Sequence, residues 1–201
     1  EIVSKAKERM GKKLRGGDKE AVEMGAVLEK VLPVLEEGKA ARTAGLTEEE
    51  KFVIKSFGLI TLKPIIYAAN IAESDMASGS NDLVKQVEEY ASAQGAGVVT
   101  ICAEAEMQLI GMNTDEKKEF LDEMGVKETG LNKLIQETYT LLGLRTYFTA
   151  GEKEVRAWTI NAGDKAPRAA GVIHTDFEKG FIKAETIGYD DFVVCTSRTK
   201  A

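Results

Sequence analysis

Two short apolar runs separated by an amphipathic segment constrain the fold of this chain more than any other feature. Residues 62–69 include the run Ile65-Ile66-Tyr67, and residues 97–102 form a second run; both are typical of strands buried in a parallel sheet. The segment 81–94 between them has the spacing of an amphipathic helix. Its apolar side chains, expected to face inward, are Leu83, Val84, Val87 and Tyr90. The pattern predicts a strand–helix–strand unit and an α/β fold class.

Polar residues follow both predicted strands. Asn70-Ile71-Ala72-Glu73 comes after the first strand, and Cys102-Ala103-Glu104 comes after the second. Because parallel sheets place ligand-binding loops at the carboxyl ends of their strands, these two segments are candidates for a shared ligand site. A simpler interpretation is that Asn70 caps a turn, that Glu73 is a solvated loop residue, and that Cys102 is a small buried hydrophobic residue.

The N-terminal segment reads as helical. Apolar residues recur at three- and four-residue steps between positions 18 and 37, Asp18 is a candidate N-cap, and Gly38 is a candidate stop signal. Pro33 is expected to kink or end this helix early. Thr47 and Glu50 have the spacing of a capping box, which predicts a second helix through residue 57. Together these signals predict a helical hairpin.

The C-terminal part changes period. Helices are predicted over 114–124 and 129–142, and a hairpin is predicted from the strands 147–149 and 155–160. A helical turn at 169–177 and a third strand at 183–187 are also predicted. Together with the hairpin, these elements give the outline of a β-grasp fold whose sheet is incomplete and has an unpaired edge.

Composition limits the class of protein. With 201 residues and 43% apolar residues the chain can bury a core, and its net charge of -6 excludes an overall basic field for nucleic acid. Any RNA contact must therefore come from a local patch. Basic residues are concentrated in the first fifteen positions, and they form either a solvated helix face or a binding surface. Cys102 and Cys195 form no zinc or disulfide pattern, and no apolar run is long enough to span a membrane.

The segment 145–192, RTYFTAGEKEVRAWTINAGDKAPRAAGVIHTDFEKGFIKAETIGYDDF, resembles the TGS domain of the YchF (Obg-like) P-loop ATPases. Upstream, LITLKPIIYAANIAE (59–73) and VVTICAE (98–104) look like the base-recognition segments of that family. The resemblance implies a helical hairpin insertion at 1–58, the rear half of a P-loop nucleotide-binding domain at 59–143, and a truncated β-grasp TGS domain at 144–201.

The same resemblance implies which residues contact nucleotide. Related GTPases use an N-K-x-D loop whose Asp reads guanine, whereas Asn70 to Glu73 resembles the N-x-x-E variant that goes with a preference for ATP. The backbone around Ile71 would serve the adenine amine, Asn70 would bridge base and loop, and the Cys102-Ala103 segment would lie beside the base. ATP with Mg²⁺ is the implied cofactor.

No G-x-x-x-x-G-K-[ST] motif occurs in the sequence, so the loop that would hold the phosphates is missing. We therefore expect no catalytic residue and no metal site in this chain, and no activity from the chain alone. The resemblance implies a longer parent that hydrolyses ATP and associates with ribosomes or RNA, in a bacterial cytoplasm or a plastid stroma, without membrane or DNA as partners.

A second hypothesis makes the chain a non-catalytic module that binds RNA or protein through the TGS domain and the basic N-terminal segment 5–15, here called the helical arm. In both hypotheses the candidate RNA or ribosome contacts are Lys12, Lys13, Arg15, Lys153 and Arg156.

Three further residue sets favour structural roles. His174, the only histidine, has no partner in the sequence that would activate a nucleophile and is expected to be structural or part of an interface. Trp158 is expected in the core, with an exposed stacking surface as the alternative. Glu104 and Glu106 are two apart and would not face each other on a helix, so they are expected at the surface.

Overall fold

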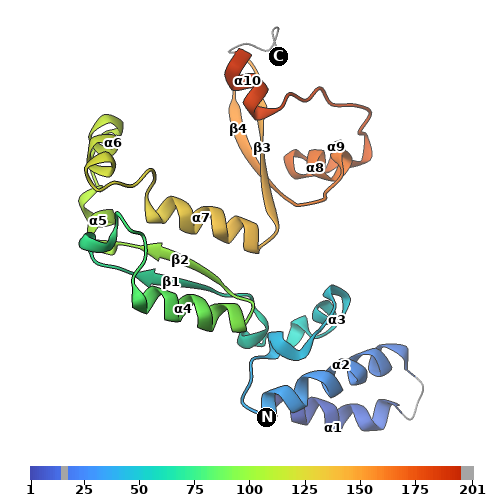
Figure 1. Cartoon of the computed structure of the whole chain (residues 1–201). Coiled ribbons are helices and arrows are strands. Elements are labelled where there is room, and N and C mark those ends of the chain that lie inside the picture. The colour runs from blue at the N-terminus through green and yellow to red at the C-terminus, as the bar shows by residue number, and fades with distance from the viewer. Residues whose placement is uncertain (15–17, 196–201) are drawn as a thin grey trace. The chain divides into compact units, whose positions relative to one another are not determined.

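The computed structural model describes residues 1–14 and 18–195, and the side chains of these residues except 11–14 and 195 (Figure 1). The chain divides into two compact units, Glu1–Glu137 and Thr138–Ala201. It has the predicted mixed α/β fold class. Within the described part of the chain, no helix is both long and apolar enough to cross a membrane.

The first unit begins with a helical hairpin formed by α1 (Ile2–Leu14) and α2 (Lys19–Glu36), whereas the predicted hairpin paired α2 with the helix that follows Thr47. As predicted, Asp18 caps α2 by accepting a hydrogen bond from the Glu20 N–H, and Gly38, with a φ of 73°, follows its end. Leu28 and Val31 are fully buried in the core of the hairpin. Pro33 was expected to kink the helix or end it early, and it does not end it, because α2 continues to Glu36 while its apolar stripe stays packed in this core.

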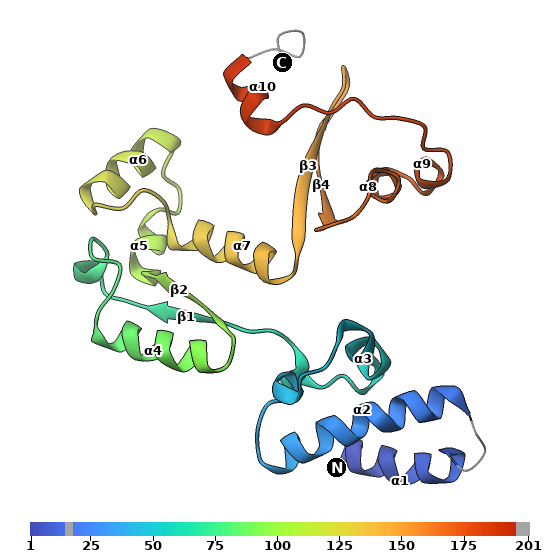
Figure 2. The same cartoon turned by 45° about the vertical axis from the view of Figure 1, so that its right-hand side comes forward.

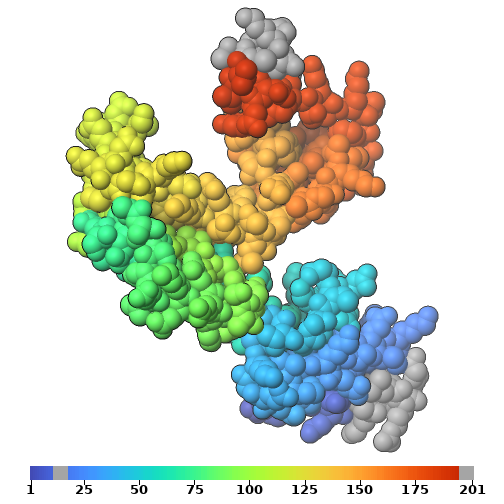
Figure 3. Space-filling model, viewed as in Figure 1, coloured from blue at the N-terminus to red at the C-terminus, as the bar shows by residue number. Residues whose placement is uncertain are grey.

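A short helical segment covers the hairpin. Thr47 and Glu50 form the predicted capping box at the start of α3 (Glu48–Val53), which contacts α2 (Figure 3). Hydrogen bonding from Lys30 and from the Thr47 backbone lowers the pKa of Glu50. The helix ends before residue 57, where the chain tightens into a 3₁₀ turn, η2 (Lys55–Phe57). Two further 3₁₀ turns, η1 (Ala41–Ala44) and η3 (Ile60–Leu62), flank these elements.

The predicted strand–helix–strand unit is present. β1 (Ile66–Asn70) pairs in parallel with β2 (Gly97–Ile101), and Asn70 lies opposite Ile101 at the carboxyl end. α4 (Asp82–Ala93) connects the strands and runs along one face of the sheet in both views (Figures 1 and 2).

The predicted inward face of α4 was wrong in two positions. Val84 and Ala91 are buried, but Leu83 is 70% and Tyr90 59% exposed. A pair of strands is narrow and covers only the stripe of α4 that points directly at it. Tyr90 instead contacts Tyr67 edge to face, with ring centroids 5.9 Å apart.

Three helices follow β2. α5 (Ala103–Gln108) was not predicted, whereas α6 (Thr114–Glu123) and α7 (Gly130–Leu141) confirm the predicted pair. A second small core joins Ile71 and Cys102 of the two loops to Val84 of α4 and Ala105 of α5. This core fixes the carboxyl edge of the sheet.

The start of α7 lies close to β2 at Gly130, where a side chain would be tightly packed. A Cβ on Gly130 would lie 3.0 Å from the Ile101 Cα and 3.2 Å from the Thr100 carbonyl oxygen. Because both neighbours are backbone atoms, we expect Gly130→Ala to lower the free energy of unfolding by about 1 kcal/mol. The measurement is urea unfolding of the 201-residue chain.

Gly97→Ala is the matched control, since its Cβ would lie 3.7 Å from the Ile66 Cγ1, an ordinary contact. It should leave stability unchanged or slightly raised. Equal stability of the two variants would show that α7 does not need this close approach.

The second unit opens with the predicted hairpin, β3 (Leu144–Ala150) paired antiparallel with β4 (Val155–Asn161). Two short helices, α8 (Ala166–Ile173) and α9 (Thr175–Lys179), follow and replace the single helical turn that was predicted. The Tyr147 hydroxyl donates to the Ala169 carbonyl at 2.9 Å, and partial burial raises the pKa of this phenol.

The predicted strand at 183–187 was wrong, because this segment runs without regular structure to α10 (Tyr189–Cys195), a helix that was not predicted. The described part of the unit holds only the sheet of β3 and β4. No side chain among residues 138–194 is buried. A strand forms only beside a partner strand, and the described residues of this unit supply neither a third strand nor a core to hold one.

Candidate functional site

Two loops meet at the carboxyl edge of the parallel sheet. The Ile71 N–H donates to the Ile101 carbonyl oxygen at 2.8 Å, which extends the pairing one residue beyond β1. The Asn70 Oδ1 accepts a hydrogen bond from the Ala103 N–H at 3.0 Å. Four of the five predicted nucleotide-binding residues, Asn70, Ile71, Cys102 and Ala103, therefore lie together, and Asn70 ties the first loop to the second.

The side chains of Ile71 and Cys102 anchor these loops to the small core beneath the edge of the sheet. They are 8% and 5% exposed and belong to the same apolar cluster. Their side chains are thus committed to packing, which leaves the backbone as the part of each residue that can meet a ligand. Cys102 also fits its simpler interpretation as a small buried hydrophobic residue.

Glu73 opens the 3₁₀ turn η4 (Glu73–Asp75), and its carboxylate accepts a hydrogen bond from the Gln108 amide at the end of α5. This partner was missed in the sequence, since the two residues are 35 positions apart and no motif joins them. Farther along the loop, the Asn81 amide donates to Asp75 at 2.8 Å, while Asn81 also caps α4. Both ends of the loop are therefore held by side chains.

Glu106 has a structural role that the sequence did not reveal. Its Oε1 accepts a hydrogen bond from the Leu131 N–H at 3.1 Å in the first turn of α7. A carboxylate is favourable at a helix N-terminus because the first N–H groups have no partner within the helix. Glu106 is half-buried rather than a plain surface residue, whereas Glu104 is exposed as expected.

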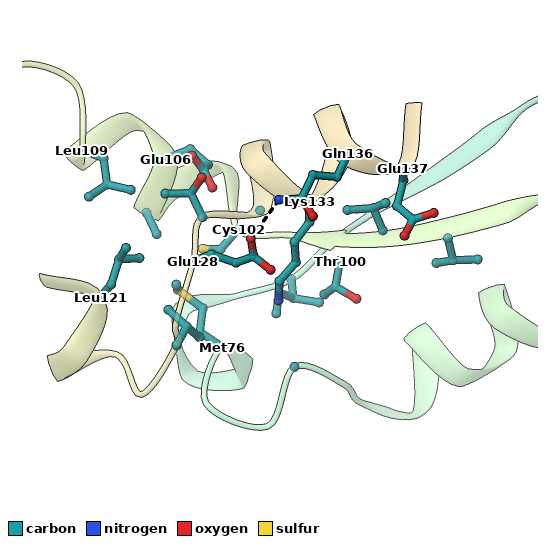
Figure 4. A pocket seen from close by; sticks show the side chains of 18 residues that line it. Met76, Thr100, Cys102, Glu106, Leu109, Leu121, Glu128, Lys133, Gln136 and Glu137 are labelled. Atoms are coloured by element: carbon teal, nitrogen blue, oxygen red, sulfur yellow. Dashed lines mark hydrogen bonds between the residues drawn. The ribbon is translucent and has the colours of Figure 1, made fainter. Parts of the chain in front are cut away.

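A cavity of about 380 Å³ lies beside β2 (Figure 4). Leu109 and Leu121 form an apolar end, and Lys133, Gln136 and Glu137 of α7 line the other. Ile71 and Cys102 contribute to its wall, but Asn70, Glu73 and Ala103 do not. The cavity therefore shares Ile71 and Cys102 with the two loops but does not include the hydrogen-bonded pair of Asn70 and Ala103. Within the described residues, no group of three or more His, Cys, Asp or Glu side chains could hold a metal ion.

The candidate RNA or ribosome contacts fall in two places. Lys12 and Lys13 belong to α1 but their side chains, and all of Arg15, lie outside the described residues. Lys153 and Arg156 are exposed in the second unit, one in the turn after β3 and the other in β4.

Arg156 stacks on an aromatic ring. Its guanidinium carbon lies 4.2 Å from the centre of the Trp158 ring, and its Nη1 is 3.8 Å from the Glu154 carboxylate. The Trp158 Nε1 donates to the Thr149 hydroxyl at 2.9 Å. Trp158 is half-buried rather than part of a core.

His174 caps α9. Its Nδ1 accepts a hydrogen bond from the Asp176 N–H at 3.2 Å. The side chain is 61% exposed. This position supports the structural role expected for it.

Comparison with known proteins gives a consistent result. Residues 144–201 match the family YchF-GTPase_C, described as a protein of unknown function (DUF933). The chain is 50% identical over 189 residues to the Ribosome-binding ATPase YchF of Haemophilus influenzae, covering 94% of this chain and 52% of the relative. It is 45% identical over 194 residues to the protein of the same name from Bacillus subtilis, covering 96% of this chain and 53% of the relative.

The fold has a solved counterpart. The structure of the Schizosaccharomyces pombe YchF GTPase aligns with a TM-score of 0.76 and 32% identity, over 99% of this chain and 56% of that chain. The chain spans about half the length of the curated relatives it matches. Over nearly its whole length, the chain is therefore similar in sequence and in structure to the C-terminal part of YchF-family proteins.

Proposed function

We propose that this chain supplies the base-recognition part of an ATP-binding and ATP-hydrolysing protein that associates with ribosomes. The names of the bacterial relatives, ribosome-binding ATPases, support both the nucleotide and the partner. We place the protein in the cytoplasm of a bacterium or in a plastid stroma. The three parts would be a helical insertion at 1–58, a half nucleotide-binding domain at 59–143 and a TGS domain at 144–201.

The observation that carries this proposal is the joined pair of loops. Asn70 and Ala103 are hydrogen-bonded at 3.0 Å across the carboxyl edge of the sheet, where parallel sheets bind ligands. In the proposal, the backbone at Ile71 accepts a hydrogen bond from the adenine amine, and Ala103 lies beside the ring. The residues present fit the base of ATP. Magnesium would balance the charge of the phosphates when bound, and we assign none of its ligands to this chain.

The choice of adenine over guanine depends on Glu73. A carboxylate in a base site can accept hydrogen bonds from the N1–H and N2 amine of guanine, and adenine has neither group. The relatives differ in name, since the bacterial proteins are called ATPases and the fission yeast protein a GTPase. Nucleotide preference is therefore the property to measure.

We expect the full-length protein to bind ATP at least as tightly as GTP, measured by calorimetry at one magnesium concentration. Glu73→Asp should move the preference toward GTP, because the shorter side chain loses its contact with α5 and resembles the guanine-reading residue. Glu119→Asp, in an exposed position of α6 away from both loops, is the matched control and should change nothing. A tenfold or greater preference of the unmodified protein for GTP would contradict the proposal.

One feature favours a second candidate function. In this alternative the chain is a non-catalytic module that binds RNA or protein through the TGS domain and the helical arm. The exposed Arg156 lies over Trp158, and an arginine held flat on a ring presents its outer face to a phosphate or a base. Nucleotide binding separates the two candidates, since the module would bind RNA and neither nucleotide.

A further inference from the structure

The hydrogen bond between Gln108 and Glu73 joins the first base-recognition loop to α5. Two other hydrogen bonds cross the same edge, from the Ile71 N–H to Ile101 and from the Ala103 N–H to Asn70. Both of those use a backbone N–H as donor, which nearly any residue would supply. The Gln108 bond is the one of the three made by two side chains, so it depends on the identity of both residues.

This bond decides where the Glu73 carboxylate can point. Glu73 is half-buried at the start of η4, and one of its oxygens accepts from the Gln108 amide. To read guanine, a carboxylate needs both oxygens free and aimed at the base, because the N1–H and N2 amine donate side by side. A carboxylate with one oxygen bonded to Gln108 has to give up or share that bond to satisfy this geometry.

We propose that Gln108 is a specificity-determining residue: by holding the Glu73 carboxylate against α5, it withholds this acceptor from guanine and leaves the loop selective for adenine. This inference rests on the proposed function of the two loops. Gln108 is a positioning residue, since it acts through Glu73 rather than on the nucleotide.

The location of the bond makes specificity the sensitive readout. Gln108 is exposed, and a solvent-exposed hydrogen bond contributes little to stability. Its loss should therefore leave the protein folded, and the shift in base preference cannot exceed the free energy of this one bond. No charged side chain other than Glu73 is hydrogen-bonded to Gln108 among the described residues.

The test uses the full-length protein and calorimetric Kd values for ATP and GTP. We expect Gln108→Ala to shift the ratio of the two Kd values toward GTP by about fivefold, the effect of freeing one charge-assisted acceptor. Gln108→Glu should shift it at least as far, because a second carboxylate repels Glu73 toward the base.

Gln136→Ala is the matched control. Gln136 donates to Glu128 at 3.4 Å, so this variant removes the same kind of bond in the same unit but away from the two loops. Its Kd ratio should equal that of the unmodified protein. Thermal unfolding of the three variants checks that each is folded.

A double variant tests whether Gln108 acts through Glu73. If it does, adding Gln108→Ala to Glu73→Ala changes the Kd ratio no further. The inference is overturned if Gln108→Ala keeps the unmodified ratio in a protein that prefers ATP, or if the two substitutions act additively. A preference of the unmodified protein for GTP would instead refute the proposed function itself, so the two failures are distinguishable.

Discussion

Phosphate release from ATP by the purified 201-residue chain is expected not to exceed the rate in buffer. Phosphoryl transfer depends on groups that hold the β- and γ-phosphates, the magnesium ion and the attacking water. The sequence contains no G-x-x-x-x-G-K-[ST] loop, and we assign only base contacts to the residues present. The full-length protein should hydrolyse ATP, so the difference between the two is the largest effect expected here.

A malachite-green phosphate assay on both proteins is the measurement. Asn70→Ala should weaken hydrolysis by the full-length protein and have no effect on the chain alone. Turnover by the 201-residue chain that disappears with Asn70→Ala would show that the catalytic groups lie in this segment after all.

Association with ribosomes is expected to be electrostatic and local. The chain carries a net charge of -6, so attraction to RNA must come from patches such as the helical arm. Replacing Lys12, Lys13 and Arg15 together by Glu should weaken binding by roughly 1 kcal/mol or more per lost phosphate contact, and added salt should weaken it steeply.

Co-sedimentation of the full-length protein with ribosomes at two salt concentrations tests this. Replacing Lys117, Lys118 and Lys127 by Glu is the matched control, because it changes the net charge equally at a different site. If neither added salt nor the replacement of Lys12, Lys13 and Arg15 weakens binding, these residues are part of a solvated surface and not a ribosome contact.

Elements defined by local chemistry were predictable from the sequence. The capping box of Thr47 and Glu50, the parallel strands on either side of α4, and the hairpin of the second unit all follow from residue spacing or from the alternation of residue types. The position of Asn70 at the carboxyl end of β1 was also predictable, because a strand pattern ends there.

Features that depend on neighbours in space were not predictable. Tyr90 was expected to be buried, but a sheet of two strands cannot cover it. The strand expected at 183–187 has no partner strand among the described residues, and only Thr186 and Ile187 of its five residues are of types enriched in strands. Pro33 lies within α2 because tertiary packing outweighs the local cost of a proline.

The candidate site shows the same division. Its loops were located from the sequence, whereas the contacts that shape them were not. Gln108 and Glu73 are far apart along the chain, and nothing in either segment indicates the other. Glu106 likewise was expected at the surface. Its carboxylate accepts a hydrogen bond from the Leu131 N–H only because α7 packs beside it in the fold.

A crystal structure of the full-length protein with a non-hydrolysable ATP analogue and Mg²⁺ tests the proposed base site most directly. We expect the adenine ring to lie between the loops at 70–73 and 102–104, with its amine within hydrogen-bonding distance of the backbone at Ile71 and with Glu73 still bonded to Gln108. An adenine bound elsewhere, for example in the cavity between β2 and Lys133, or a Glu73 carboxylate turned onto the base, would contradict this expectation.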